Sequence, residues 1–112
     1  MKMIVAYVKP FKIDAVREAL VRAGADGLTI AEVRGCGRQG GKTEIYRGAE
    51  YEVALIPKVK VEAVIPAAAL KGVLAALREA ASTGRIGDGK VFVLDVLSAM
   101  RIRTGETGLA AL

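Results

Sequence analysis

Glycines and basic residues occur together in two stretches of the sequence, a combination that suits phosphate binding. Residues 35–42 read GCGRQGGK, and residues 83–90 read TGRIGDGK. Glycine allows successive backbone N–H groups to point toward an anion, and a lysine or arginine beside them adds positive charge. A helix C-cap followed by a tight turn into a strand would also explain the glycines of residues 83–90. Taken alone, that second stretch favours the turn.

Residues 35–43 also resemble two nucleotide-binding motifs, but the context fits neither. Residues 35–40 match G-x-G-x-x-G, and residues 41–43 resemble the end of a Walker A motif. Both motifs require a helix to begin here, and the continuation GKTEIYRG has no apolar helical period. Walker A also requires glycine at position 36, where this sequence has cysteine. We therefore reject a Rossmann site and treat the Walker A match as chance.

Two further stretches each allow a functional and a structural interpretation. Residues 101–103, Arg-Ile-Arg, place two guanidinium groups on one face of an expected extended segment. These groups could form a phosphate clamp, or they could be charges that protect an exposed edge strand. Residues 46–51, YRGAEY, could flank a hairpin, or their tyrosines could serve as an interaction anchor or a modification target. Together the motifs suggest two basic, glycine-framed sites.

The composition narrows the possible functions. The 112 residues include no histidine and a single cysteine, Cys36, so the commonest general acid/base is missing and no internal disulfide can form. The net charge of +5 favours anionic partners, and nucleic acid, nucleotide phosphates and small dicarboxylates all stay open. Lys9 and Pro10 interrupt the N-terminal apolar run, so we expect neither a signal peptide nor a membrane anchor. We predict a cytoplasmic protein with one domain over residues 1–112.

The sequence divides into two similar halves, each of which predicts a strand, a helix and a second strand. The first strand of each half ends at a proline, Pro10 or Pro66. Apolar stripes predict one helix around Ile13, Val16, Leu20 and Ala23 and another around Leu70, Val73, Leu74 and Leu77. Glycine C-caps and Asp-Gly turns are expected before the second strands, at Gly24, Asp26-Gly27, Gly84 and Asp88-Gly89.

Two βαβ units joined by a long loop predict an α+β fold. The simplest arrangement is a ferredoxin-like split βαβ sandwich, βαββαβ, with both helices on one face. A short extended segment should follow the last strand, and the tail after it should fray. On the uncovered sheet face, Lys58, Lys60 and Glu62 would lie together with apolar residues such as Val5. That apolar surface suggests that the chain associates with itself.

The longer motifs resemble a known family. YRGAEY at residues 46–51 and TGRIGDGKVFV at residues 83–93 resemble the two signature segments of the PII nitrogen-regulatory signal-transduction proteins. Further similar segments occur along nearly the whole chain, among them KPFK at 9–12, GRQGG at 37–41, PKVKVE at 57–62 and RIRTGE at 101–106. Their length and unusual chemistry argue against chance similarity.

The resemblance implies a homotrimer of ferredoxin-like subunits that senses nucleotide and 2-oxoglutarate without being an enzyme. ATP or ADP would bind competitively in clefts between subunits, and 2-oxoglutarate would bind together with Mg²⁺ and ATP. The implied nucleotide-binding residues are Thr29, Gly37, Arg38, Gln39, Glu62, Val64, Gly87, Asp88, Gly89, Lys90 and, from the neighbouring chain, Arg101 and Arg103. The implied 2-oxoglutarate contacts are Gln39, Gly40, Gly41, Lys58 and Gly87, and Gln39 would also help to hold Mg²⁺.

The resemblance also implies how the protein would act on others. Residues of about 37–54 resemble the flexible T-loop, whose shape responds to ligand and whose tip contacts target proteins. Tyr51 matches the tyrosine that is uridylylated or adenylylated in many members. The implied targets are an ammonium channel, which would recruit the protein to the membrane, the modifying enzyme of glutamine synthetase, and an arginine-pathway kinase.

Two other functions stay open from the residues themselves. The basic composition allows a ferredoxin-like nucleic-acid-binding module, although the chain is poor in aromatic residues and lacks the K/R-G-F/Y-G/A-F signature. A small phosphate-handling enzyme ranks lowest, because the chain has no histidine and no paired carboxylates near its glycine stretches. We therefore expect no catalytic residue and no nucleic-acid partner.

Overall fold

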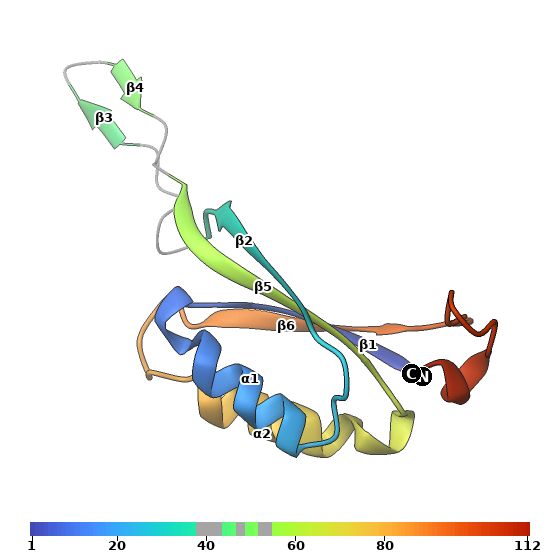
Figure 1. Ribbon diagram of the computed structural model, residues 1–112. Helices are drawn as coiled ribbons and strands as arrows, with labels where there is room; N and C mark the ends of the chain where they lie inside the picture. The colour runs from blue at the N-terminus through green and yellow to red at the C-terminus, as the bar shows by residue number, and fades with distance from the viewer. Residues whose placement is uncertain (38–43, 47–48, 52–54) are drawn as a thin grey trace.

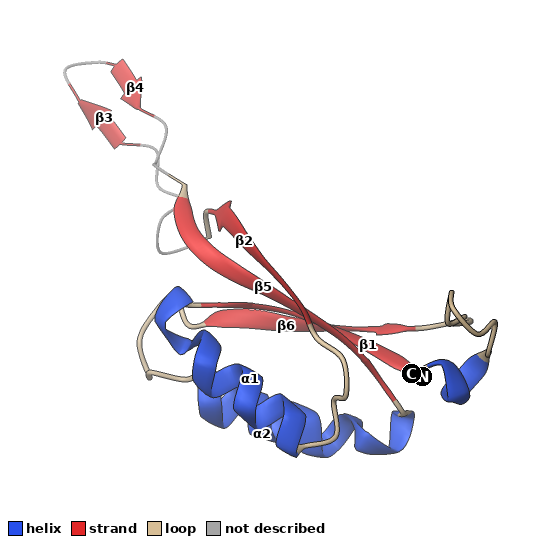
Figure 2. Cartoon of the chain, in the orientation of Figure 1, coloured by secondary structure: helices blue, strands red, loops and turns tan. Residues whose placement is uncertain are grey.

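The computed structural model describes residues 1–37, 44–46, 49–51 and 55–112, and its main feature is a four-stranded sheet (Figure 1). The strands lie in the order β2-β5-β1-β6, and each neighbouring pair is antiparallel. Both helices cover the same face of the sheet (Figure 2). The elements are β1 (Lys2–Val8), α1 (Ile13–Arg22), β2 (Thr29–Gly35), β5 (Ile56–Ile65), α2 (Leu70–Ala81) and β6 (Gly89–Asp95). This arrangement confirms the predicted ferredoxin-like α+β sandwich.

The core lies between the helices and the sheet. Alternate residues of the central strands β1 and β5 are buried against the helices, because successive side chains of a strand point to opposite faces. α1 buries Val16 and Leu20, and α2 buries Val73 and Leu77. All four belong to the predicted apolar stripes, which the structure confirms. The buried core consists of Ile4, Ala6, Val8, Val16, Leu20, Ala25, Val59, Val61, Ala63, Ile65, Val73, Leu77 and Ala81.

A proline marks the start of each helical segment. Pro10 begins the 3-10 turn Pro10–Lys12 that leads into α1, and Pro66 precedes the 3-10 turn Ala67–Ala69 that leads into α2. Proline suits the first turn of a helix, because its φ is already helical and its missing N–H would have no partner there. The two halves therefore follow one plan up to their helices, as the sequence predicts.

α1 ends in the predicted glycine cap. The N–H of Gly24 donates to the carbonyl of Val21 at 3.2 Å, and the N–H of Ala25 donates to the carbonyl of Leu20 at 3.0 Å. Gly24 has a φ of +107°, which favours glycine. This pair of bonds is the Schellman C-cap, and it leaves no need for a side chain to close the helix.

α2 ends differently, and the cap predicted at Gly84 is wrong. The last helical residue is Ala81, and Ser82 is already extended, with φ −73° and ψ 135°. Gly84 lies further along, inside the link to β6.

The Asp-Gly turns are also displaced from their predicted places. In the first half the turn lies at residues 23–24, and Asp26-Gly27 falls in the irregular link to β2. In the second half the turn lies at residues 86–87, and Gly89 is already the first residue of β6. The first turn therefore directly follows the end of α1, whereas the second lies beyond the end of α2 and just before Asp88.

The segment between β2 and β5 contains two short strands. β3 (Glu44–Tyr46) and β4 (Ala49–Tyr51) pair antiparallel with each other, beyond the end of β5 and away from the helices (Figure 1). They fall within the predicted loop of residues 37–54 and agree with the alternative that residues 46–51 flank a hairpin. The rest of that predicted loop, apart from Gly37, lies outside the described residues.

The C-terminal segment folds back on itself. Met100 forms a bridge with Thr107, and the 3-10 turn η3 (Gly108–Ala111) follows. Figure 1 shows the two ends of the chain side by side. The fraying tail predicted from the sequence is therefore wrong, and so is the extended conformation predicted for residues 101–103, because residues 102–104 form a turn.

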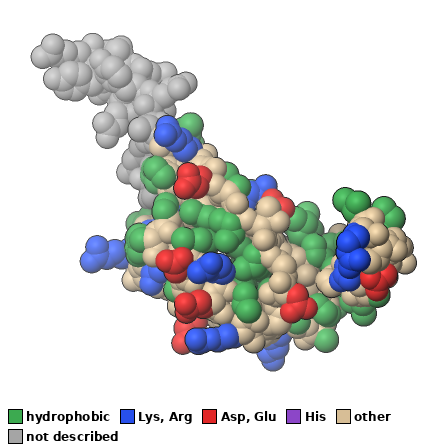
Figure 3. Space-filling view, viewed as in Figure 1, with side chains coloured by type: hydrophobic (Ala, Val, Ile, Leu, Met, Phe, Trp, Pro, Cys, Tyr) green, Lys and Arg blue, Asp and Glu red, His purple; other side chains and the backbone are tan. Residues whose placement is uncertain are grey.

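The sheet face opposite the helices mixes charged and apolar side chains. Lys60 and Glu62 form an ion pair of 2.7 Å, and the rings of Tyr7 and Phe92 meet edge to face at 6.3 Å. Phe92 is 53% exposed and Leu94 is 48% exposed. On the side of the molecule that Figure 3 shows, hydrophobic side chains also reach the surface among scattered acidic and basic ones. None of the helices in the described part of the chain is long and apolar enough to cross a membrane.

Candidate functional site

The 82–88 loop, which joins α2 to β6, is folded around the side chain of Asp88. The backbone N–H groups of Thr83 and Gly84 donate to Asp88 Oδ2 at 2.8 and 3.0 Å, and the Thr83 hydroxyl donates to Asp88 Oδ1. An aspartate that accepts from nearby backbone N–H groups closes a turn. The first two amides of the glycine stretch are therefore satisfied by the chain's own carboxylate and are not free to cradle a phosphate.

Lys9 anchors this loop to the end of β1. Its Nζ lies 3.1 Å from Asp88 Oδ1 and donates to the Thr83 hydroxyl at 3.2 Å. Hydrogen bonds from the Thr83 hydroxyl and amide, with Lys9 beside them, hold the pKa of Asp88 well below its usual range. Asp88 is therefore ionised at neutral pH, and its charge is balanced by Lys9.

Gly89 lets the loop enter β6 directly against β1. Its φ is +107°, and a Cβ added there would lie 1.7 Å from the backbone oxygen of Tyr7. Every other residue type carries a Cβ, so this approach requires glycine. In the sheet register, Gly89 pairs with Val8, so the glycine fixes where the loop meets the central strand.

Lys58 reaches the same loop from the other side of β1. It lies on β5, which is separated from β6 by β1, and its Nζ donates to the backbone carbonyl of Gly87. Two lysines of the described chain therefore hold the 82–88 loop through polar contacts, Lys9 from the end of β1 and Lys58 from β5. The position of the loop depends on the folded sheet and not on local sequence alone.

These residues border an open hollow of about 480 Å³, which we call the loop hollow. Three cationic side chains line it, those of Lys58, Arg85 and Lys90, together with the exposed Cys36. Positive charge beside glycine-rich backbone suits an anionic ligand. Among the described residues, its lining is Tyr7, Gly35, Cys36, Gly37, Lys58, Arg85, Gly87, Asp88, Gly89, Lys90 and Phe92.

The loop hollow gathers six residues that the sequence analysis singled out. They are Gly37, Lys58, Gly87, Asp88, Gly89 and Lys90. Arg85, a cation within the glycine stretch TGRIGDGK, also lines the hollow, although the resemblance did not include it among the nucleotide-binding residues. Sequence reasoning missed Tyr7, which is the cross-strand partner of Lys90, because that pairing follows only from the register of β1 and β6.

A second hollow, of about 410 Å³, lies near the C-terminus, and we call it the tail hollow. It contains the other three predicted residues of the sheet, Thr29, Glu62 and Val64, and its wall includes Leu109 and Leu112. Thr29 and Glu62 are direct partners in the pairing of β2 with β5. A hydrogen bond from Lys60 to Glu62 raises the pKa of Lys60, so Lys60 stays charged at neutral pH.

The two C-terminal arginines stand apart from both hollows. In the described part of the chain, neither Arg101 nor Arg103 lines the loop hollow or the tail hollow. Arg101 instead forms an ion pair with Glu106 at 3.1 Å. The turn at residues 102–104 replaces the single extended face on which the two guanidinium groups were expected.

Several predicted residues lie outside the described part of the chain. They are Arg38, Gln39, Gly40 and Gly41, and they include the residue assigned to Mg²⁺. Tyr51 belongs to β4, of which only the backbone is described. Among the described residues, no group of three or more His, Cys, Asp or Glu side chains could hold a metal ion.

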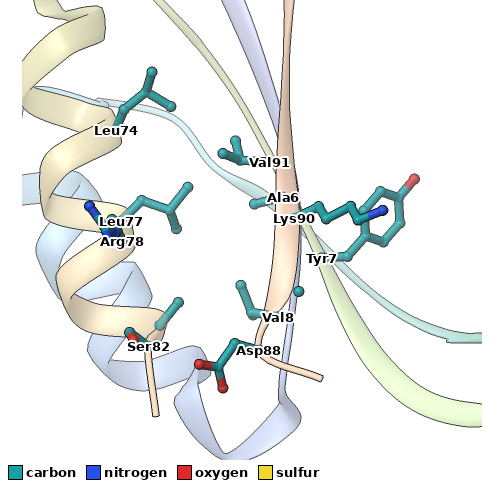
Figure 4. A pocket seen from close by; sticks show the side chains of 12 residues that line it. Ala6, Tyr7, Val8, Leu74, Leu77, Arg78, Ser82, Asp88, Lys90 and Val91 are labelled. Atoms are coloured by element: carbon teal, nitrogen blue, oxygen red, sulfur yellow. The ribbon is translucent and has the colours of Figure 1, made fainter. Parts of the chain in front are cut away.

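A third hollow, about 420 Å³, opens between α2 and the edge of the sheet (Figure 4). Leu74 and Leu77 of the helix face Val91 of β6, and its lining is mainly apolar. Lys90 points to the opposite side of the sheet. Arg78 and Lys90 border this cleft, whereas Lys58, Arg85 and Lys90 border the loop hollow beside more glycine backbone. The loop hollow is therefore the better candidate for a charged ligand.

The fold and the loop hollow define a small ferredoxin-like protein with a cationic, glycine-framed site. The family model for "Nitrogen regulatory protein P-II" matches residues 1–106. The chain belongs to the nitrogen regulatory protein P-II family, as the resemblance in its sequence predicts. Membership in this family supports a role as a signal-transduction regulator.

Curated relatives match over nearly their whole length. Proteins named "Nitrogen regulatory protein P-II" from Mesorhizobium japonicum and Rhizobium meliloti are each 57% identical to this chain, over 99% and 100% of both sequences. "Nitrogen regulatory protein P-II 1" of Escherichia coli K12 is 54% identical over 100% of both sequences. These names describe regulatory proteins and not enzymes, which fits the expectation that the chain is not an enzyme.

Proposed function

We propose that this chain is a PII-type signal transducer that senses ATP or ADP together with 2-oxoglutarate. It regulates nitrogen-assimilation proteins through residues 37–54. The observation that carries the proposal is the loop hollow, where Lys58, Arg85 and Lys90 converge on the glycine-rich backbone of residues 87–89. Three cations beside one open hollow suit a triphosphate and a dicarboxylate.

Each ligand has a place in this proposal. The phosphates of ATP or ADP bind at Gly87–Lys90, with Gly37, Arg38 and Gln39 beside them. One carboxylate of 2-oxoglutarate pairs with Lys58, near the backbone of residues 37–41. Lys58 already donates to the Gly87 carbonyl, so a carboxylate at Lys58 acts directly on the loop that meets the phosphates.

Magnesium enters the proposal only with the nucleotide. No cluster of three metal-ligating side chains exists among the described residues. Mg²⁺ is commonly held by phosphate oxygens and only one or two protein groups, so such a cluster is not required. Gln39 is the proposed protein ligand.

A neighbouring copy of the chain completes the proposed nucleotide site. Thr29, Glu62 and Val64 border the adenine or ribose, yet they line the tail hollow and not the loop hollow. We propose that the loop hollow of one copy and the tail hollow of the next share one nucleotide, with Arg101 and Arg103 supplied by that next copy. The exposed Phe92 and Leu94 on the uncovered sheet face support a homotrimer.

In this proposal the protein acts by binding other proteins. The candidate targets are an ammonium channel, the modifying enzyme of glutamine synthetase and an arginine-pathway kinase. Tyr51 is the proposed site of uridylylation or adenylylation. The protein is cytoplasmic in this proposal and reaches the membrane through the channel.

Titration calorimetry tests the ligand assignment. We expect ATP and ADP to bind at micromolar concentrations, and 2-oxoglutarate to bind only when Mg²⁺ and ATP are present. Lys58→Gln should weaken 2-oxoglutarate binding by about tenfold or more, because a charged hydrogen bond is lost. Lys71→Gln, which removes the same charge from an exposed position of α2, is the matched control and should bind like the unchanged protein.

The same samples test the assembly. Sedimentation should give the mass of a trimer, and a monomer at micromolar concentration would contradict the shared site. No heat with either nucleotide would end the proposal as a whole. Equal 2-oxoglutarate binding by the Lys58 and Lys71 variants would overturn the place given to Lys58.

The nucleic-acid alternative has one supporting observation. Tyr7 and Phe92 lie together on the uncovered sheet face, where modules of similar fold stack bases on aromatic rings. A gel shift with single-stranded RNA tests it. A salt-dependent shift of the RNA band that is lost with Phe92→Ala would favour nucleic-acid binding over ligand sensing.

A further inference from the structure

The backbone around Arg101 is fixed by the tail that follows it. The N–H of Arg101 donates to the carbonyl of Glu106 at 2.8 Å, and the N–H of Gly105 donates to the carbonyl of Arg101 at 2.8 Å. The bridge between Met100 and Thr107 continues this pairing. Residues 100–107 therefore form a closed turn, with Arg101 and Glu106 facing each other at its base.

The side chain of Arg101 is held at two further points. Nη1 donates to Glu106 Oε1 at 3.1 Å, and Nη2 donates to the Leu112 backbone oxygen at 3.0 Å. The Thr104 hydroxyl donates to the same Glu106 oxygen at 2.8 Å, so the carboxylate is itself oriented. Figure 3 shows basic and acidic side chains next to each other at this end of the molecule.

The guanidinium keeps donors for a further ligand. It has more N–H groups than these two contacts use, and the Arg101 side chain is 39% exposed. A single exposed ion pair contributes little to the stability of a protein. The network around Glu106 is larger than such a pair, and its clearest effect is to give Arg101 one orientation.

The same tail also forms a wall of the tail hollow. Leu109 and Leu112 line it opposite Thr29 and Glu62, and Leu112 is the residue whose backbone oxygen holds Arg101. The tail thus connects the guanidinium to the hollow in which the proposed function places the adenine or ribose.

We propose that Glu106 is a positioning residue for nucleotide binding, which holds the Arg101 guanidinium ready to meet phosphate. The inference rests on the proposed function, because it requires Arg101 to contact the nucleotide. A long side chain loses rotamer freedom when it binds a ligand, and a partner that orders it beforehand reduces that loss. Glu106 acts through Arg101 and does not touch the nucleotide itself.

Calorimetric titration of the full-length chain with ATP tests this role. Glu106→Ala should weaken ATP binding about three- to tenfold, as expected when one long side chain must be ordered on binding. Glu106→Gln keeps an oxygen that can accept from Arg101 and should recover most of the affinity. Glu79→Ala removes the same charge from an exposed position of α2 and should bind ATP like the unchanged protein.

A double-mutant cycle separates positioning from general damage to the fold. If Glu106 acts through Arg101, adding Glu106→Ala to Arg101→Ala should cause no further loss of ATP affinity. Additive losses would show a merely structural role and overturn the proposal. Tighter ATP binding by Glu106→Ala and Glu106→Gln would also overturn it, because Glu106 would then compete with phosphate for Arg101.

Two further outcomes are distinguishable. If the unchanged protein binds no ATP, the proposed function fails and this inference fails with it. If the unchanged protein binds ATP and Glu106→Ala binds equally well, only the inference fails. Should Glu106→Ala not fold, Thr104→Ala removes the hydroxyl that orients Glu106 and should give a smaller loss of affinity in the same direction.

Discussion

The two βαβ halves follow one plan as far as the ends of their helices and then differ in the link to the second strand. In the first half, backbone hydrogen bonds from Gly24 and Ala25 close the end of α1. In the second half, the 82–88 loop is folded around the Asp88 side chain and is contacted by Lys9 and Lys58. The first link borders the tail hollow through Gly24, Asp26 and Gly27, whereas the second borders the loop hollow.

The two links are therefore held in place in different ways, although each of them borders a hollow. A Schellman cap uses only the backbone of its own helix, so it is complete without the rest of the fold. The network of Asp88 joins the 82–88 loop to the end of β1, and Gly87 joins it to β5. The geometry of the 82–88 loop is therefore set by the whole sheet. Such support from rigid elements keeps several cationic side chains in place around one hollow.

The largest expected effect compares two glycines with the same backbone angle. Gly24 and Gly89 both have φ +107°, but a Cβ at Gly89 would lie 1.7 Å from the backbone oxygen of Tyr7, and a Cβ at Gly24 would meet nothing within 4 Å. Gly89→Ala should lower the free energy of unfolding by at least about 3 kcal/mol, because β1 or β6 must move. Gly24→Ala should lower it by about 1–2 kcal/mol, which is the backbone strain alone.

Urea denaturation followed by circular dichroism measures both losses. Equal losses of unfolding free energy in the two variants would mean that the close approach of β6 to β1 adds no cost to Gly89→Ala. The difference between the two links would then depend on Asp88 alone.

The second effect compares the two Asp-Gly dipeptides. Asp88 uses both carboxylate oxygens, Oδ2 for two backbone amides and Oδ1 for the Thr83 hydroxyl and Lys9. Asn has one carbonyl oxygen and no charge, so Asp88→Asn should lower the melting temperature by several degrees. Asp26 is exposed and lies in the irregular link, so Asp26→Asn should leave the melting temperature nearly unchanged. A fall of the same size in both variants would contradict a special role for the Asp88 network.

The sequence predicts most of the fold because the fold depends on regular patterns. The apolar spacing of Val16 and Leu20, repeated at Val73 and Leu77, identifies both helices and the face that they bury. The C-cap predicted for α2 at Gly84 is wrong, because Ser82 is already extended and the Gly84 amide donates to the Asp88 carboxylate instead of to the helix. No rule of local propensity reveals that contact.

The candidate site is predictable in part for a similar reason. Gly87, Gly89 and Lys90 stand together in the sequence and stay together in the structure. That Lys58 meets them depends on the strand order β5-β1-β6, which places β5 one strand away from the loop. The extended face expected for Arg101 and Arg103 fails because Glu106 closes the chain into a turn. Their contact with nucleotide stays a prediction, as do the roles of Arg38 to Gly41.

The smallest expected effect is on how the stability contributed by Asp88, compared with that contributed by Asp26, depends on pH. Hydrogen bonds from Thr83 and the nearby Lys9 lower the pKa of Asp88 in the folded state, whereas in the unfolded chain it should be about 3.9. The folded state therefore binds a proton at Asp88 less readily, and the stability that Asp88 contributes is fully present above the unfolded pKa. It is lost as the pH falls below about 4, through the range between the two values.

Melting curves of the unchanged protein, Asp88→Asn and Asp26→Asn between about pH 7 and about pH 3 measure this dependence. The gap between the unchanged protein and Asp88→Asn should narrow as the pH falls, because the unchanged protein loses what the variant already lacks. Lys2 also lowers the pKa of Asp95, but Asp95 is present in all three proteins and cancels in the comparison. The small gap for Asp26→Asn should not depend on pH in this way. A gap for Asp88→Asn that stays constant down to about pH 3 would mean that the lost hydrogen-bond geometry, and not the charge of Asp88, holds the 82–88 loop.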